Sequence, residues 1–224
     1  MRIKQPPRSK ERNRVKYVNK HGVPTLNVQV IADDRGRFTW ALIGVPGSNP
    51  DWPAYASSVM CHAMQLVAAR FGYFLICDAG YPDRDELLIP WPKTELSLNS
   101  AKSNYNYYQS CARQPIECAF GRWERRWGVL WRRIEVDTAF ASDVILATMN
   151  LHNLCMERNV AEPPPQQGFT PLARAEEPPV GRPPAPRDES LRQRITRAVA
   201  EAGLTRAPLP SGVHGRQEVD GVVG

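Results

Sequence analysis

The chain has 224 residues, of which 29 are basic and 23 acidic, so its formal net charge at pH 7 is +6. At roughly 100–200 residues per domain, this length predicts one domain, or one domain with a long tail. No run approaches the roughly 18 apolar residues of a membrane span, and the first residues lack the apolar core of a signal peptide, so we expect neither. The five cysteines form no CxxC pair and no metal-ligand spacing, as is typical of reduced thiols in an intracellular protein.

The N-terminal part of the chain is predicted to contain strands behind a basic arm at residues 1–20. Residues 26–32 and residues 37–43 are rich in strand-forming side chains and flank the turn at residues 33–36. This pattern predicts a β-hairpin. Residues 52–70 suit a helix.

Shorter apolar runs and two longer helices are predicted next. Residues 73–77 are wholly apolar, which predicts a buried strand. Residues 83–109 are predicted to be mostly loop, with one more strand at residues 87–89. Residues 116–133 and residues 138–158 are predicted to be helical. Strands followed by helices around a central sheet indicate an α/β or an α+β fold, of which we expect the α/β fold.

The composition changes near residue 160, which predicts that a domain at residues 1–160 ends there. Of the 64 residues from 161 to 224, 11 are proline. We expect a disordered linker at residues 161–187 and a disordered tail at residues 205–224, because such segments bury too little apolar area to order themselves. Residues 188–204 predict a short amphipathic helix that docks on the domain or recruits a protein partner. Its apolar residues are four apart on one face: Leu191, Ile195 and Val199.

Two acidic residues are the candidates for chemistry. Asp78 follows the apolar run at the carboxyl end of a predicted strand, where ligands bind in α/β sheets, although an Asp there also caps turns. Glu117 lies near the start of a predicted helix, where the helix dipole alone favours an acid. Together they suit a divalent metal ion, since carboxylate oxygens bind Mg²⁺ and Mn²⁺. A two-metal site needs a third carboxylate. The other candidates are Asp33, Asp34 and Asp51, although Asp is common in hairpin turns and Asp51 could simply cap a helix.

Aromatic and basic residues alternate in the predicted helix at residues 116–133. Trp123, Trp127 and Trp131 are four apart on one face, a spacing that favours core packing over stacking on bases. The arginines fall largely elsewhere on the helix, where they contact phosphates or form a solvated face: Arg122, Arg125, Arg126, Arg132 and Arg133. His152 and Asn153 are either catalytic or, as we favour, a buried pair that locks the end of the last long helix.

Five segments in order resemble motifs of the PIF/Harbinger-type DDE transposases and the nucleases domesticated from them. Residues 17–30 are similar to the "NRKG…S.N.Q" stretch, and Pro46-Gly-Ser-Asn-Pro-Asp51 is similar to the "PGS.HD" loop. Further along, Leu75-Ile-Cys-Asp-Ala-Gly-Tyr-Pro82 resembles "L.GDSGYP", Ile116-Glu-Cys-Ala-Phe-Gly-Arg122 resembles "ERAFGR", and Leu151-His-Asn-Leu-Cys155 resembles "LHN.C". The five matches cover most of residues 1–158.

The resemblance implies an RNase H-like mixed sheet flanked by helices, with a triad of two Asp and one Glu that binds a divalent cation, Mg²⁺ or Mn²⁺. On the matching positions Asp78 is the second Asp and Glu117 is the Glu, while Asp51 is an accessory metal residue. The implied substrate is DNA and the implied location is the nucleus. The residues expected to contact DNA are Lys16, Arg122, Arg125 and Arg126.

The chain also departs from the family pattern. The resemblance places the first catalytic Asp a few residues before Met1, so we expect an N-terminally truncated domain without its first strand, with two of three acids and impaired catalysis. Pro50, Ala79 and Cys118 stand where the family has His, Ser and Arg. The alternatives are a non-catalytic DNA- or protein-binding remnant of a transposase, and a product that does not fold stably.

Overall fold

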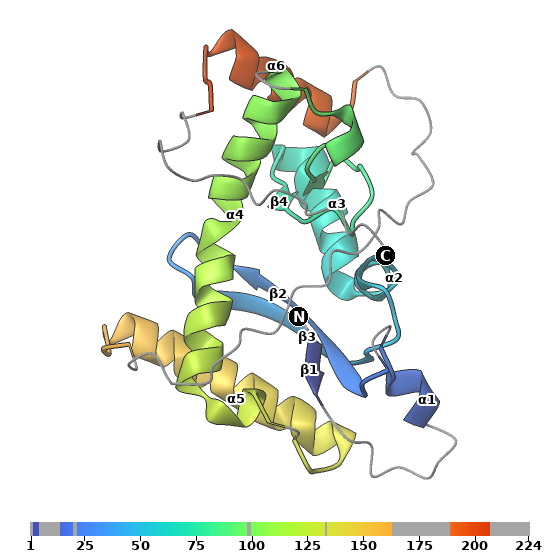
Figure 1. Ribbon diagram of the computed structural model, residues 1–224, viewed down its shortest axis with the longest axis vertical. Coiled ribbons are helices and arrows are strands. Elements are labelled where there is room, and N and C mark those ends of the chain that lie inside the picture. Colours follow the sequence, from blue (N-terminus) through green and yellow to red (C-terminus); the bar gives the residue numbers. More distant parts are fainter. Residues whose placement is uncertain are drawn as a thin grey trace, which may run out of the picture.

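The computed structural model of the chain describes residues 2–4, 14–19, 22–97, 100–132, 134–162 and 189–206. The expected linker at 161–187 and tail at 205–224 lie almost entirely outside these residues. Figure 1 shows two small sheets, with the long helix α4 running past both of them. The described part is therefore a mixed α/β fold, as expected from the sequence, although its strands do not form one sheet.

The first sheet is antiparallel and has the strand order β1-β2-β3. It consists of β1 (Arg2–Lys4), β2 (Thr25–Ala32) and β3 (Phe38–Pro46), and a one-turn helix α1 (Arg14–Tyr17) lies between the first two strands. The predicted hairpin is confirmed by the pairing of β2 with β3. Asp33 closes the hairpin turn by accepting hydrogen bonds from the backbone N–H groups of Arg35 and Arg37.

The main core lies between this sheet and two helices, α4 (Ala101–Arg126) and α5 (Thr138–Glu157). Trp123 is fully buried in it, and Trp127 and Trp131 pack against it, so the core interpretation of the tryptophans is confirmed. The 3₁₀ turn Gly128–Leu130 ends the run that the sequence predicted as helix to residue 133.

The second sheet is a parallel pair, β4 (Leu75–Ile76) and β5 (Leu87–Leu88). The predicted strand at 73–77 therefore shrinks to two paired residues, and its expected burial is wrong at Tyr73, which is 67% exposed. Within the described ranges, no backbone pairing joins this sheet to β1-β2-β3. Backbone pairing of so few residues leaves this sheet dependent on the helices around it.

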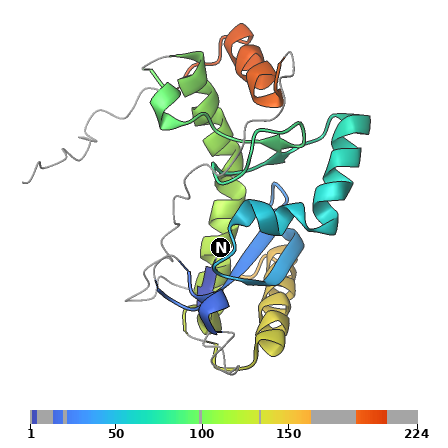
Figure 2. The same cartoon turned by 90° about the vertical axis from the view of Figure 1, so that its right-hand side faces the viewer.

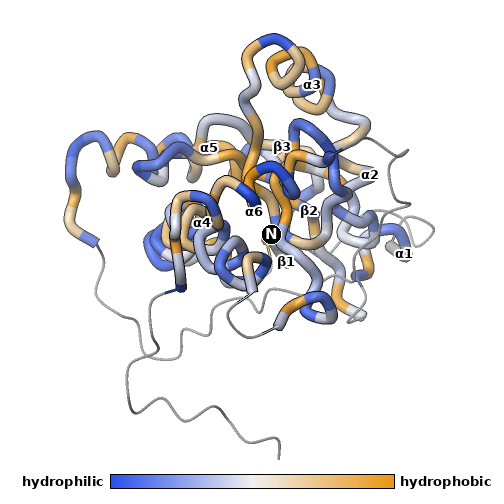
Figure 3. The backbone as a smooth tube through the Cα atoms, turned by 90° about the horizontal axis from the view of Figure 1, so that it is seen from above, coloured by the Kyte–Doolittle hydropathy of each residue, from blue (hydrophilic) through white to orange (hydrophobic). Residues whose placement is uncertain are grey.

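The predicted helix at 52–70 is two helices, α2 (Asp51–Ala56) and α3 (Val59–Phe71). Ser58 interrupts the run because its side chain caps α3 by accepting a hydrogen bond from the N–H of Cys61. Helix α3 projects away from the two sheets (Figures 2 and 3). Its outer side exposes apolar side chains, among them Val59 and Leu66.

Helix α4 corrects the prediction of loop over residues 83–109, because it begins at Ala101 with Ser100 as its N-cap. The 3₁₀ turn Lys93–Glu95 precedes it. The predicted helix start at residue 116 is wrong, because Pro115 and the residues before it lie inside the 26-residue helix. Burial on both sides of the proline outweighs the hydrogen bond that it removes.

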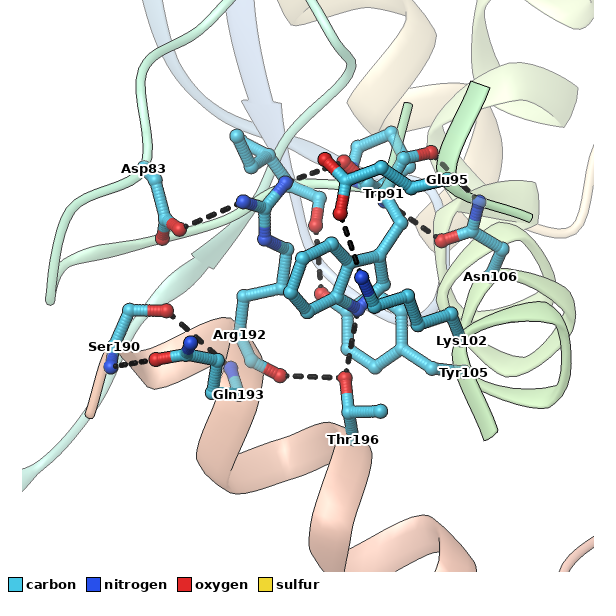
Figure 4. A network of polar contacts seen from close by, with 12 residues as sticks. Asp83, Trp91, Glu95, Lys102, Tyr105, Asn106, Ser190, Arg192, Gln193 and Thr196 are labelled. Carbon is cyan, nitrogen blue, oxygen red and sulfur yellow. Dashed lines mark hydrogen bonds and ion pairs between the residues drawn. The ribbon is translucent and has the colours of Figure 1, made fainter. Parts of the chain in front are cut away.

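The predicted C-terminal helix is confirmed as α6 (Leu191–Glu201), which starts with a capping box of Ser190 and Gln193. It docks on α4 and β5 through buried Leu191, while Ile195 packs against the same cluster. Trp91 lies at the centre of this contact, as Figure 4 shows. Among the described residues, no helix is both long and apolar enough to span a membrane.

Candidate functional site

Asp78 lies in the loop directly after β4 and is exposed. One carboxylate oxygen accepts a hydrogen bond from the N–H of Gly80 at 3.0 Å, so Asp78 closes a turn, as the simpler interpretation of the sequence held. The strand end beside it is fixed to α4, because the Gln109 side-chain amide donates to the carbonyl oxygen of Cys77 at 2.7 Å. The position of Asp78 is thus set by β4 on one side and α4 on the other.

Glu117 lies in the interior of α4 and not in its first turn. The helix-dipole explanation for this acid is therefore wrong, because that effect fades beyond the first turn. The Glu117 carboxylate is about two-fifths exposed and forms an ion pair with Arg113 at 3.1 Å, one turn earlier on the helix. Its charge is compensated by a neighbour on α4 and remains within reach of solvent.

The two acids are connected through one face of α4. Gln109, Arg113 and Glu117 are four residues apart and share this face. Gln109 contacts the strand end before Asp78, and Glu117 is two turns further along, about 12 Å at 1.5 Å per residue. Arg113 lies between them. Burial, and then the charge of Asp78, raises the pKa of the Cys77 thiol, while Arg113 opposes this rise, so Arg113 also acts at the strand end.

Asp51 is the first residue of α2 and is held by two side chains of β2. The Asn27 amide donates to an oxygen of its carboxylate at 2.6 Å, and the Gln29 amide donates to its backbone carbonyl at 2.6 Å. The expectation that Asp51 caps α2 is wrong, since Pro50 is at the N-cap and no side chain caps this end. Burial raises the pKa of Tyr81 well above its ordinary value, and the charges of Asp51 and Asp78 add to this. Tyr81 therefore lies within range of both carboxylates.

The two acids of the hairpin turn, Asp33 and Asp34, do not lie with Asp51 and Asp78. Burial raises the pKa of Asp33, but hydrogen bonds and charge from Arg37 outweigh it and lower the pKa. Asp33 holds Arg37 in an ion pair at 2.7 Å, which is a structural contact of the turn. Asp34 is exposed beside it.

The described residues do not by themselves fit a divalent metal ion. Carboxylate oxygens are the right chemistry, but no group of three or more His, Cys, Asp or Glu side chains comes together within the described ranges. Three buried oxygens on one face of β2 have no hydrogen-bond partner among the described residues: Thr25 Oγ1, Asn27 Oδ1 and Gln29 Oε1. They adjoin Asp51 and not Glu117, so they do not complete a set with both candidate acids.

The basic residues expected to contact DNA lie on other surfaces. Arg122 and Arg125 both pair with Glu162, and Arg126 donates to the carbonyl oxygens of residues 160 and 161. Arg126 is nine residues after Glu117, which places the two on opposite sides of α4 at 100° per residue. Lys16 is exposed in α1, where its backbone carbonyl accepts a hydrogen bond from Ser48.

His152 and Asn153 are structural, as the sequence favoured. Asn153 exchanges two hydrogen bonds with the backbone of Phe38, each at 2.8 Å. The His152 ring is buried against Phe38 and donates from Nε2 to the carbonyl oxygen of Gly36. Burial lowers the pKa of His152, and the charges of Arg126 and Arg122 lower it further. The pair therefore fastens α5 to the β2–β3 hairpin.

Sequence reasoning missed Gln109, Arg113 and Tyr81. The spacing of Gln109, Arg113 and Glu117 is visible in the sequence, but it becomes a shared face only if the helix starts well before Pro115. Tyr81 follows Asp78 by three residues in a loop, where no periodicity indicates what its hydroxyl approaches.

Comparison with known proteins identifies the family. The family model for the DDE superfamily endonuclease matches residues 1–153. The chain belongs to the DDE superfamily of endonucleases. A similar protein is the putative nuclease HARBI1 of Xenopus laevis, which is 24% identical over 151 residues. This alignment covers 64% of the chain and 41% of the relative, so the chain spans about two-fifths of that protein. No solved structure matches significantly.

Membership of the DDE superfamily confirms the expected family at the level of a DDE endonuclease domain. Asp78 and Glu117 both lie within the matched region, as do Asp51 and the arginines of α4. DDE superfamily endonucleases are generally dependent on divalent metal ions, and DNA is the substrate that a nuclease of this family implies.

Proposed function

We propose that this chain is a transposase-derived nuclease domain of the PIF/Harbinger type that acts on DNA phosphodiesters in the nucleus. Asp78 and Glu117 are its acidic site residues, in an arrangement related to RNase H. The observation that carries the proposal is the Gln109 hydrogen bond, which ties the strand end before Asp78 to the α4 face that bears Glu117.

The chemistry of the two acids supports this role. Asp78 is exposed, and within the described part of the chain one of its carboxylate oxygens accepts the hydrogen bond that fixes the loop. Glu117 is partly exposed, so exchange of its Arg113 partner for a cation does not require the core to open. An octahedral Mg²⁺ or Mn²⁺ site would need about six ligands, so Asp78 and Glu117 would supply only part of such a set, with Asp51 as an accessory residue.

The basic side chains supply the proposed contacts to DNA phosphates. Arg122, Arg125 and Arg126 present guanidinium groups along the end of α4, and Lys16 is exposed on α1. Arginine suits phosphate because its planar donors engage two oxygens together. These contacts position DNA without reading its sequence, so binding weakens steeply as salt rises.

A second candidate is a non-catalytic module that binds DNA or a protein. The ion pair of Glu117 with Arg113, and the lack of a three-residue ligand group in the described ranges, favour it. The polar outer side of α6, which includes Arg194, is the surface left for a protein partner, since the apolar side packs on α4.

Cleavage of supercoiled plasmid DNA in Mn²⁺ separates these candidates. For the nuclease we expect nicking that Asp78→Asn lowers by about a hundredfold or more, since even residues that only hydrogen-bond to a metal ligand change activity by about 10–100-fold. Asp143→Asn is the matched control, because Asp143 is an exposed acid on α5. Salt-sensitive DNA binding without nicking would leave the non-catalytic module. Sequencing the 5′ end of the transcript shows whether a further acid is encoded ahead of residue 1.

A further inference from the structure

Two arginines near the end of α4 hold a single carboxylate of the same chain. Arg122 Nε is 2.6 Å from one oxygen of Glu162, and Arg125 Nη2 is 3.2 Å from the other. The two guanidinium groups thus engage both oxygens of one anion. This is the arrangement by which paired arginines bind a carboxylate or a phosphate.

The segment after α5 is guided onto these arginines by local structure. Asn159 has a left-handed backbone with a φ of 50°, which turns the chain back toward α4 at the end of α5. Arg126 Nη2 then donates to the carbonyl oxygens of Val160 and Ala161, each at 3.3 Å. Residues 160–162 therefore lie across the basic end of α4, with Glu162 on Arg122 and Arg125.

The contact of Glu162 with Arg122 and Arg125 is accessible to solvent, so another anion can take the place of Glu162. The Glu162 side chain is 47% exposed, and those of Arg122 and Arg125 are about 30% exposed. Ion pairs this accessible to water contribute little to stability. The segment buries no large apolar side chain on α4, since Val160 is itself 49% exposed. A stronger anion can therefore replace Glu162 without disturbing the core.

We propose that Arg122 and Arg125 form a phosphate-binding site for the DNA backbone and that Glu162 occupies this site in the free protein. The inference rests on the proposed function, because it takes DNA as the partner. Glu162 acts as an internal competitor: each encounter with DNA must first displace its carboxylate. The chain consequently binds DNA more weakly than its basic residues alone would allow.

The competing explanation is that residues 160–162 simply fasten the end of α5 to α4. In that case Glu162 and DNA do not compete, and neutralising Glu162 changes DNA affinity only through the net charge. The matched control is Glu201→Gln, which makes the same charge change on α6 at an exposed residue whose partner is Arg197.

The experiment is a titration of fluorescent duplex DNA with the full chain in EDTA, followed by fluorescence anisotropy over a range of salt concentrations. We expect Glu162→Gln to bind several-fold more tightly than both the wild-type protein and Glu201→Gln. Its salt dependence should also be steeper, by about 0.9 in the log–log slope for each additional phosphate neutralised. Adding Arg122→Gln and Arg125→Gln to Glu162→Gln should abolish this gain. Thermal unfolding of each variant checks that it is folded.

If Glu162→Gln and Glu201→Gln bind DNA equally tightly, and the wild type binds it in a salt-dependent way, Glu162 does not compete with DNA. DNA then remains the partner. A gain that survives the two arginine substitutions would overturn the site at Arg122 and Arg125. Absence of DNA binding by every variant at low salt would overturn DNA as the partner as well. Because EDTA removes the metal, the outcome is independent of whether Asp78 supports cleavage.

Discussion

Cationic side chains lie near both ends of α4, but their surroundings differ. At the N-terminal end, Lys102 and the Arg192 of α6 enclose the Trp91 ring, at 4.0 Å and 3.9 Å from its centroid. At the C-terminal end, Arg122 and Arg125 share the exposed carboxylate of Glu162. In the first arrangement Trp91 and Arg192 are nearly buried, although Lys102 is partly exposed, while the Glu162 carboxylate of the second arrangement is open to solvent.

Burial explains what each end does. Arg192 and Asp83 form an ion pair at 3.0 Å in which both side chains are about 15% exposed, and the Trp91 N–H donates to Thr196 at 2.9 Å (Figure 4). Such contacts cannot open without leaving polar groups unpaired, so they fix α6 in place. At the C-terminal end of α4, water can take the place of Glu162 on Arg122 and Arg125, because these side chains are accessible to solvent. The difference teaches that Arg122 and Arg125 of α4 can exchange their anion, while Arg192 of α6 holds the structure together.

The largest expected effect is at Trp91. Replacement by Ala removes a nearly buried ring, two cation–π contacts and a hydrogen bond to α6, so we expect a loss of about 3–5 kcal/mol in the free energy of unfolding. Urea unfolding followed by circular dichroism measures this, and trypsin cleavage within α6 should accelerate. Tyr73→Ala, at an exposed aromatic residue, is the control with little effect. A comparable loss in both variants would refute a special role for Trp91.

An intermediate effect is expected from His152, which lies near the arginines of the other end. Its pKa is lowered in the folded chain from the ordinary value of 6.5, chiefly by burial, so below pH 6.5 the unfolded chain binds a proton that the folded chain does not bind. The free energy of unfolding should therefore have its full value above pH 6.5 and decrease as the pH falls below 6.5. The pH dependence of urea midpoints tests this, with His152→Gln expected to flatten the curve. His62→Gln, at an exposed histidine, is the control for the loss of a histidine as such.

The smallest expected effect on stability is at Glu162. Replacement by Gln removes an exposed ion pair, so we expect a change of no more than about 1 kcal/mol in the free energy of unfolding. The same urea titration measures it beside Trp91→Ala. A loss above about 2 kcal/mol would show that the segment fastens α5 to α4 after all, which would remove the contrast between the two ends.

The parts of the fold that sequence predicted correctly are those that local patterns determine. The β2–β3 hairpin and α5 have strong apolar patterns, and α6 begins with the local capping-box residues Ser190 and Gln193. The N-terminal half of α4 escaped prediction because its Asn, Ser and Tyr residues are weak helix formers. That half is stabilised by packing against α6, which lies far along the chain.

The candidate site was predictable residue by residue but not in its contacts. Asp78 and Glu117 stand out by position, and their placement at a strand end and on a helix is confirmed, while their chemical roles stay predictions. The Arg113 partner of Glu117 is only four residues away and was visible in principle. Glu162 is 37 residues from Arg125, and no local pattern predicts a contact over such a separation.

Pro115 has a consequence for how the chain opens. It lies between the two halves of α4 and has no N–H to bond the carbonyl oxygen of Cys111, so one rung of the helical hydrogen-bond ladder is missing there. A local unfolding event that frees α6 and the first half of α4 can end at this gap while the second half stays on β2 and α5. Amide hydrogen exchange should then divide α4 at the proline into two cooperative units, a slowly exchanging one around Trp123 and a faster one beside Trp91.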